Sequence, residues 1–287
     1  MSLILALAAA IFFAVGTVLQ QRVARTATEE EAASAGFLLR LARKPLWLAG
    51  IVADAGGFVC QAIALGIGRI VVVQPVLATS LVFALPFGAW LDGRRVTHRE
   101  MWAAAAVTGG LAAFLVLADP SGGKPDASTA AWLVAFAVSA VLCGAAWVAA
   151  RGASPMRRAV LLGCATGILF GLSAGLTKAT VEELDDGILN VFEHWHVYAL
   201  AVVGYVSMSL SQASLQTGAL GAAVATQMAL DPITSVVLGT LAFDEQLHDT
   251  PLGAIAALGG IAVMIGGIVA LAVQSPAPAE AASLAEA

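Results

Sequence analysis

The sequence predicts an all-α, polytopic membrane protein with about nine transmembrane helices. Of its 287 residues, 60% are hydrophobic and 11% are charged, and the mean hydropathy is +0.89, which is outside the usual range of a water-soluble domain. The apolar residues form runs long enough to cross a hydrocarbon core of about 30 Å. The 29 glycines are typical of helices that pack closely in lipid.

The expected spans follow one another from the first residues onward. The first run has no basic segment before it, so we interpret it as a helix and not as a signal peptide. Two long apolar blocks, 45–91 and 197–243, each hold two helices joined by a tight turn. The spans are predicted at 3–20, 46–66, 70–91, 101–118, 130–150, 159–178, 197–216, 219–243 and 252–273.

The spans divide the chain into four parts. A first four-helix repeat covers 1–118 and includes a cytoplasmic loop at 20–44, whose last part, 36–44, resembles an interfacial helix with a basic face. A connecting helix with its flanking loops covers 119–158. A second four-helix repeat covers 159–273, and a disordered tail rich in Pro, Ala and Glu covers 274–287.

The loop charges predict the orientation. Eleven of the 14 Lys and Arg residues fall on one side of this topology, and that side is therefore cytoplasmic. The predicted location is the plasma membrane, with the N-terminus outside and the C-terminus in the cytoplasm.

The two four-helix units match one another. Ala6, Ala10 and Ala14 of the first span align with Gly163, Gly167 and Gly171 of the sixth. Further on, Gln61-Ala62 corresponds to Gln212-Ala213, and Gly109-Gly110 to Gly259-Gly260. A single connecting span inserts the second unit from the opposite face, so the repeat is inverted, an architecture that recurs in transporters. The small-residue face of the sixth span, which continues to Gly175, predicts very close packing against a neighbour.

Short motifs give a resemblance to a known family. The acidic turns Leu91-Asp-Gly-Arg-Arg-Val-Thr97 and Phe243-Asp-Glu-Gln-Leu-His248 resemble those of the drug/metabolite transporter superfamily, whose members include the EamA-like proteins. The segments 41–50 and 71–75 are similar to the NIPA-like magnesium transporters, which also have nine spans. The NIPA-like glutamate of the second helix would fall near Phe58, whereas the acid here is Asp54, about one turn earlier.

Two carboxylates lie deep within predicted spans. Asp54 and Asp231 are expensive to place in lipid unless they face a cavity or a partner, so both are candidate substrate-binding or metal-binding residues. Carboxylate and amide oxygens suit a hard cation. The polar residues nearby that could complete the site are Gln61, Gln74, Gln212 and Gln227. The alternative is that each acid bonds a neighbouring helix or stays protonated.

Prolines predict interruptions in two helices. Asp231-Pro232 can break its helix in mid-membrane, because Pro cannot donate a backbone hydrogen bond and Asp is a good N-cap. Pro75, with Pro86, has the same part in the other half. Lys178 is expected to extend to the membrane surface, and His194 and His196 are interpreted as interfacial residues.

The chain has no nucleotide-binding loop, nucleophile elbow or zinc-protease motif, so we expect neither an enzyme nor a cofactor. Basic residues flank the membrane, which argues against nucleic-acid binding. The expected partners are the lipid bilayer and a small-molecule or ion substrate, with a homodimer left open. The preferred function is transport by alternating access, with a divalent cation such as Mg²⁺ favoured. The alternatives are an exporter of a small organic metabolite or drug, and a non-transporting scaffold.

Overall fold

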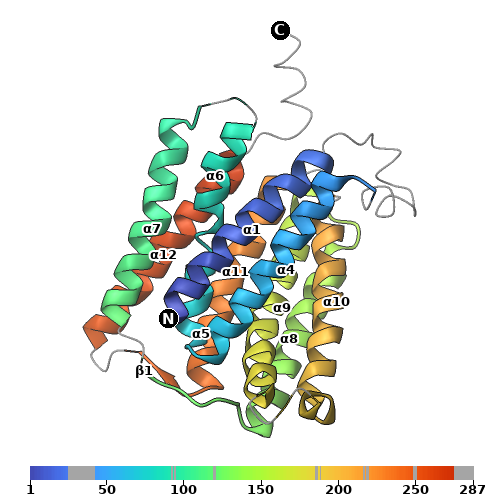
Figure 1. Cartoon of the computed structure of the whole chain (residues 1–287), viewed down its shortest axis with the longest axis vertical. Coiled ribbons are helices and arrows are strands. Elements are labelled where there is room, and N and C mark those ends of the chain that lie inside the picture. The colour runs from blue at the N-terminus through green and yellow to red at the C-terminus, as the bar shows by residue number, and fades with distance from the viewer. Residues whose placement is uncertain are drawn as a thin grey trace.

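The computed structural model consists almost entirely of helices, with one short pair of strands (Figure 1). It describes residues 1–24, 43–91, 93, 95–118, 121–184, 187, 189–215, 217, 220–247 and 251–274. The predicted interfacial segment up to residue 42 and the predicted tail from residue 275 lie outside the described residues. The α-helices are α1 (Ser2–Ala24), α4 (Pro45–Gly66), α5 (Ile70–Leu77), α6 (Ser80–Leu91), α7 (His98–Ala118), α8 (Thr129–Ala150), α9 (Pro155–Glu183), α10 (Trp195–Leu215), α11 (Leu220–Leu241) and α12 (Pro251–Gln274). A 3₁₀ turn, η2 (Asn190–Glu193), precedes α10, and the strands are β1 (Ser121–Gly122) and β2 (Glu245–Gln246).

Local sequence explains where several helices begin. Pro45 and Pro155 occupy first-turn positions, where the missing N–H costs nothing. Thr97 and Glu100 form a reciprocal capping box at the start of α7: the Thr97 amide donates to the Glu100 carboxylate at 2.7 Å, and the Glu100 amide donates to the Thr97 hydroxyl at 3.2 Å. The hydroxyl of Ser128 accepts from the Ala131 amide and caps α8.

Six helical segments in the described part are long and apolar enough to cross a bilayer. They are Ser2–Gln20, Pro45–Gly66, Ile70–Leu91, Thr129–Ala150, Pro155–Glu183 and Ala222–Leu241, and two shorter apolar helices are Trp195–Ser211 and Leu258–Ala270. Large apolar side chains such as Val52, Val141 and Val202 face outward, which in water would be a liability and in lipid is the expected arrangement. The chain is a helical, membrane-embedded protein, as its composition predicts.

The helices pack as pairs that bring distant parts of the chain together (Figure 1). The most extensive contacts join α7 to α12, α1 to α4, and α9 to both α10 and α11, while α8 packs on α9. Near the middle of the bundle, α5 packs against α11. Residues Val71, Phe114, Val236 and Ile261, one from each of α5, α7, α11 and α12, form a small buried cluster where these helices meet.

The α7–α12 contact is reciprocal. A Cβ atom built on Gly260 would lie 2.7 Å from the Phe114 amide nitrogen and 2.9 Å from the Gly110 carbonyl oxygen. A Cβ on Gly110 would in turn strike the carbonyl oxygen of Gly260 and the amide nitrogen of Met264. Each glycine therefore contacts the other glycine and the residue four positions after that other glycine. The two antiparallel backbones touch with no side chain between them.

The glycine face of α9 packs directly on α11, as the sequence predicts. Gly163 faces Ala223 and Thr226, and Gly167 and Gly171 lie against the backbone on either side of Asp231. Gly175 faces Leu238. A Cβ at Gly167 would approach the Asp231 amide nitrogen to 3.1 Å, and one at Gly171 would approach its carbonyl oxygen to 3.1 Å. The close packing of this span is confirmed.

The proline interruptions differ from the prediction. The expected span 70–91 divides after Leu77: the hydroxyl of Thr79 donates to the Val76 carbonyl at 2.6 Å, and the Thr79 carbonyl accepts from Val82 at 2.9 Å. The break therefore follows Pro75 by a helical turn. At Pro232 the prediction of a break is wrong, because α11 continues through it. Contact with Gly167 and Gly171 on both sides of Asp231 holds the backbone on a helical course although Pro232 donates no hydrogen bond.

We expect Gly110→Ala and Gly260→Ala each to destabilise the protein, because the added methyl group meets backbone atoms that cannot rotate away. Overpacking of this kind costs about 1–3 kcal/mol. Gly109 and Gly259 are matched controls, since a Cβ at either position would have no neighbour within 4 Å; their alanine variants should be neutral or more stable, by up to about 1 kcal/mol. Unfolding of the four variants in one detergent measures this, and equal effects at all four positions would contradict the reciprocal contact.

Candidate functional site

Asp54 lies at the contact between α1 and α4. Its carboxylate accepts a 2.5 Å hydrogen bond from the Gln20 side-chain nitrogen. Gly16 and Gly50 make room for this pair: a Cβ at Gly16 would strike the Asp54 carboxylate, and one at Gly50 would lie 2.8 Å from Gln20 Cγ. Asp54 therefore has a partner within a helix pair, which the sequence left as an alternative. Gln20 was missed, although an amide near the end of an apolar span is a visible signal.

Asp231 is held in a different helix pair. Its backbone packs on the glycine face of α9, and its carboxylate accepts a 3.2 Å hydrogen bond from the Ser235 hydroxyl one turn later. The partners of Asp54 and Asp231 thus come from separate elements. Within the ranges that the structure describes, no group of three or more His, Cys, Asp or Glu residues is gathered in a way that could hold a metal ion.

Two buried glutamines lie on α5 and α11, the helices whose contact we call the seam. Gln74 on α5 is 2% exposed and Gln227 on α11 is 8% exposed. Within the described structure the side-chain nitrogen of each has no hydrogen-bond partner. The Gln227 side-chain oxygen accepts from the Ser211 hydroxyl of α10 at 3.2 Å. An unpaired buried donor costs roughly 1–3 kcal/mol, so each of these two nitrogens is a group that a polar partner would stabilise.

The two glutamines hold matching places in the sequence. Each is followed eighteen residues later by an acid, Asp92 after Gln74 and Glu245 after Gln227. The other two amides predicted for the site are less informative: Gln61 on α4 is half-buried, and the Gln212 side chain lies outside the described part of the chain.

The interruption between α5 and α6 and the Asp231 position lie at one level of this seam. Arg69, just before α5, donates to the carbonyl of Gly122 in β1, and β1 pairs with β2 just after α11, so α5 begins where α11 ends. Val71 touches the position of Gly239. Thr79 and Asp231 each lie eight residues further along, about 12 Å at 1.5 Å per residue.

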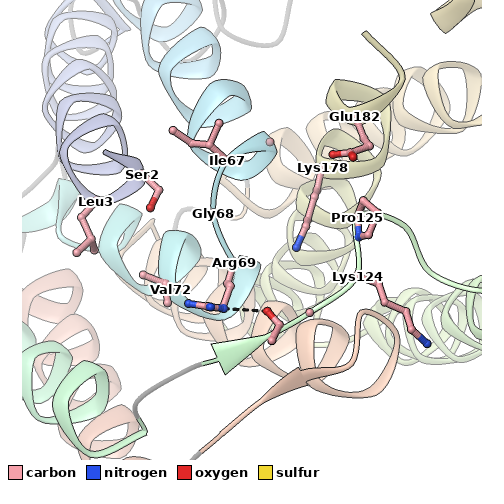
Figure 2. A pocket seen from close by; sticks show the side chains of 13 residues that line it. Ser2, Leu3, Ile67, Gly68, Arg69, Val72, Lys124, Pro125, Lys178 and Glu182 are labelled. Carbon is pink, nitrogen blue, oxygen red and sulfur yellow. Dashed lines mark hydrogen bonds between the residues drawn. The ribbon is translucent and has the colours of Figure 1, made fainter. Parts of the chain in front are cut away.

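A pocket of about 520 Å³ opens at the end of the bundle where α5 begins (Figure 2). Glycines form much of its wall, so backbone replaces side chains there. The lining residues are Ser2, Leu3, Gly66, Ile67, Gly68, Arg69, Val72, Gly122, Gly123, Lys124, Pro125, Lys178 and Glu182. Three of these 13 residues are positively charged and one is negatively charged. The share of charged residues in the pocket is therefore higher than in the whole chain, where it is 11%.

Lys178 and Glu245 form a buried ion pair beside this pocket. Lys178 Nζ lies 2.8 Å from Glu245 Oε1, and the two side chains are 7% and 0% exposed. The carboxylate also accepts from the amides of Ile70 and Val71, each at 2.9 Å, so it neutralises the positive end of α5. The expectation that Lys178 extends to the surface is wrong, because Glu245 gives its ammonium group a buried partner. Sequence reasoning noted Glu245 in an acidic turn but did not assign it a role in the site.

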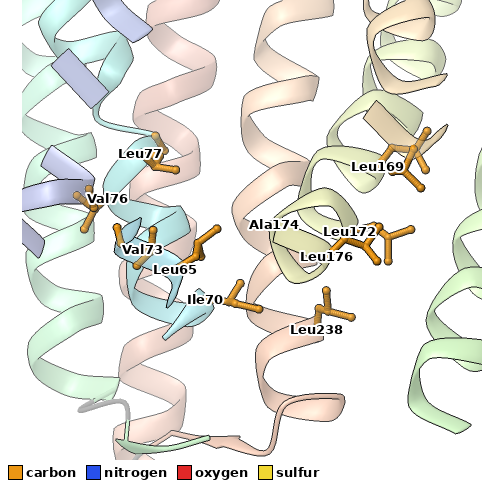
Figure 3. Close-up of a cluster of buried hydrophobic side chains, with 14 of the residues drawn as sticks. Leu65, Ile70, Val73, Val76, Leu77, Leu169, Leu172, Ala174, Leu176 and Leu238 are labelled. Atoms are coloured by element: carbon orange, nitrogen blue, oxygen red, sulfur yellow. The ribbon is translucent and has the colours of Figure 1, made fainter. Parts of the chain in front are cut away.

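Apolar side chains seal the seam below this ion pair. Ile70 of α5 extends toward α11, and Leu238 of α11 extends toward α9, whose Leu172 and Leu176 belong to the same buried cluster (Figure 3). The ion pair is therefore shielded from water on its inner side, which strengthens its electrostatic attraction.

His196, near the start of α10, is buried against neighbouring helices. It is 5% exposed, its Nδ1 lies 2.5 Å from the Glu183 carboxylate, and Asp126 lies 3.5 Å from its Nε2. Trp132 donates to the same Asp126 oxygen at 2.9 Å. This group ties α8, α9 and α10 together at their ends, whereas His194 is more exposed.

We expect Lys178→Met and Glu245→Gln each to lower the free energy of unfolding strongly, by about 3–5 kcal/mol, because each leaves a buried partner uncompensated. The double variant should lose less than the sum of the single variants. Lys124→Met is the control, since the Lys124–Asp244 pair is 63% and 56% exposed and should contribute about 0–1 kcal/mol. Unfolding in detergent tests this, and strict additivity would show that the two charges do not interact.

No protein-family profile and no solved structure matches the chain. A curated relative does: an uncharacterized protein of Corynebacterium glutamicum is 30% identical over 280 residues, which cover 97% of this chain and 97% of that protein. The match extends over nearly the full length of both chains. The chain therefore belongs to the same protein family as this protein of Corynebacterium glutamicum.

Proposed function

We propose that this protein is a secondary transporter that moves a small polar solute along the α5–α11 seam by alternating access. The observation that carries the proposal is the pair of buried glutamines, Gln74 and Gln227, at matching positions of the two halves, each with an unpaired side-chain nitrogen in the described structure. Transporter sites lie at the junction of inverted repeats, near the middle of the membrane.

The packing supports nine spans arranged as two inverted four-helix repeats. In the first half α1 packs on α4 and on α5 with α6, and in the second half α9 packs on α10 and on α11. The last helices of the halves, α7 and α12, meet in the reciprocal glycine contact. The acidic turn of the first half comes just before α7. The acidic turn of the second half includes β2, which pairs with β1 just after α7. The 21 residues of α7, about 32 Å, therefore separate the two turns.

The interruption of the third span supports alternating access. Unwound backbone at mid-membrane is stable only where protein or a cavity surrounds it. Ala78 and Thr79 are buried, and they lie at the level of Asp231. A half-helix that ends here can tilt separately from its continuation, which is the motion that opening one side of the seam requires.

The chemistry of the seam favours a small organic metabolite over other solutes. The unpaired groups of Gln74 and Gln227 are N–H donors, and donors bind the carboxylate, carbonyl or phosphate oxygens of a solute. A divalent cation such as Mg²⁺ is the second candidate, favoured by the Asp54 and Asp231 carboxylates, which offer the oxygen ligands that it requires. In both cases the proposed family is the drug/metabolite transporter superfamily, in the plasma membrane, with the N-terminus outside.

Flux into proteoliposomes tests this function. The solutes are radiolabelled small carboxylates, amides and sugars, with Mg²⁺ in a parallel series. We expect an organic solute to move faster than into protein-free vesicles, and Gln74→Met or Gln227→Met to lower that flux at least about tenfold, since each removes a hydrogen bond worth about 1.4 kcal/mol. Gln246→Met is the matched control, because Gln246 is exposed in β2.

The outcomes separate the candidates. Mg²⁺ flux that disappears in both Asp54→Asn and Asp231→Asn would assign the cation. Absence of every flux, together with co-purification of another membrane protein, would replace transport by a scaffold role. Organic flux that is equal in wild type and both glutamine variants would remove the seam as the route.

A further inference from the structure

We propose that the pocket at the start of α5 binds the oxyanion group of a small solute, a carboxylate or a phosphate, at Arg69, with Lys178 as a second cation that lines the same pocket. The binding claim stands on the pocket itself. The claim that the bound solute is the transported one rests on the function proposed above.

Arg69 is positioned and retains free donors. Its Nε donates to the Gly122 carbonyl at 2.9 Å, which fixes the guanidinium plane at the pocket wall (Figure 2). The two terminal nitrogens carry four further N–H groups, and the described structure gives them no protein partner. A guanidinium fixed at one nitrogen presents its remaining donors as a fork that matches a carboxylate or phosphate.

Lys178 supplies the second cation from α9. Its ammonium group donates one hydrogen bond to Glu245 at 2.8 Å and lies 5.1 Å from the centre of the Phe243 ring. Lys178 also lines the pocket. An ammonium group has three donors, so two are available to a ligand. Because the side chain is 7% exposed, a hydrogen bond from it to an anion would be screened little by water.

The acids around the pocket are already engaged, with one exception. Glu245 accepts from Lys178 and from two amides of α5, and Asp244 pairs with Lys124. Glu182 lines the pocket one turn beyond Lys178. It would repel a second negative group on that side, so the geometry favours a solute whose single oxyanion group faces Arg69.

The glycines of the pocket wall leave room for such a group to approach the backbone. Gly66 and Gly68 on one side and Gly122 and Gly123 on the other present backbone to the cavity. Gly122 and Gly123 have φ values of +64° and +106°, which favour glycine, so the turn that carries the Arg69 acceptor is not readily replaced by a bulkier wall.

Isothermal titration of inorganic phosphate and of acetate into the purified full chain in nonionic detergent tests the pocket. We expect one saturable site per chain for at least one probe, with affinity at least tenfold weaker in Arg69→Gln and partly restored in Arg69→Lys. Arg99→Gln is the matched control, because Arg99 is exposed at the opposite end of α7. Unchanged thermal unfolding of the variants confirms that they fold.

A lipid phosphate could occupy the same donors, so the titration is repeated in nanodiscs of phosphatidylcholine with and without phosphatidylglycerol. If the probe binds more weakly in the anionic discs, and this difference disappears in Arg69→Gln, the oxyanion site is supported and the lipid headgroup is the source of the bound oxyanion. Absence of saturable binding to folded wild type, or equal affinity in wild type and Arg69→Gln, would overturn the proposal. If Arg69→Gln loses binding but keeps solute flux, the pocket stands as a binding site and its link to transport fails.

Discussion

The buried carboxylate of Glu245 is the interaction on which this end of the molecule depends. A charge with no exposed surface is tolerated only when every oxygen is engaged, and here an ammonium group and two backbone amides engage it. Those donors come from α9 and from the start of α5, while Glu245 itself follows α11 in β2. One side chain therefore joins both halves of the chain, fixes where α5 begins, and places Arg69 beside the pocket. Any separation of α5 from α11 at this end would have to break these bonds.

Elsewhere the fold is held by backbone contact. Helices in lipid gain little from hydrophobic association, since the lipid chains are as apolar as their side chains. Close approach at Gly110 and Gly260, and along the glycine face of α9, supplies dispersion contacts instead. The two kinds of contact have different consequences. The glycine contacts are local and dry, and they make α7 with α12 and α9 with α11 into stiff pairs. The α5–α11 contact differs from both, because α5 and α11 carry buried polar side chains and α5 ends at an interruption.

The sequence predicted the elements well and their polar partners poorly. Helix positions follow from the length of apolar runs, which the bilayer dictates, and the packing of α9 follows from glycines spaced four apart. The break after Pro75 and the continuity through Pro232 could not be distinguished locally, because both prolines lack the same N–H. The difference is that Gly167 and Gly171 of α9 support the backbone beside Pro232. This is a tertiary contact, so the local sequence does not reveal it. For the same reason Lys178 was assigned to the surface: its partner is 67 residues away in the chain. Asp54 and Asp231 were recognisable as exceptional, but whether they faced a partner or a ligand depended on Gln20 and Ser235.

The distribution of satisfied and unsatisfied groups changes which residues are the stronger site candidates. The rarity of carboxylates in the spans drew attention to Asp54 and Asp231, yet each already accepts a hydrogen bond within its own helix pair or helix. The glutamines are chemically milder and less conspicuous in sequence, but Gln74 and Gln227 each retain an unused buried donor. A ligand is stabilised most by groups whose hydrogen bonds the protein has left unmade, because binding then recovers a desolvation cost that folding has already incurred. The free donors at the seam and those of Arg69 and Lys178 in the pocket are of one kind. If both proposals hold, a solute with acceptor oxygens would meet compatible donors at the end of the bundle and again in its interior.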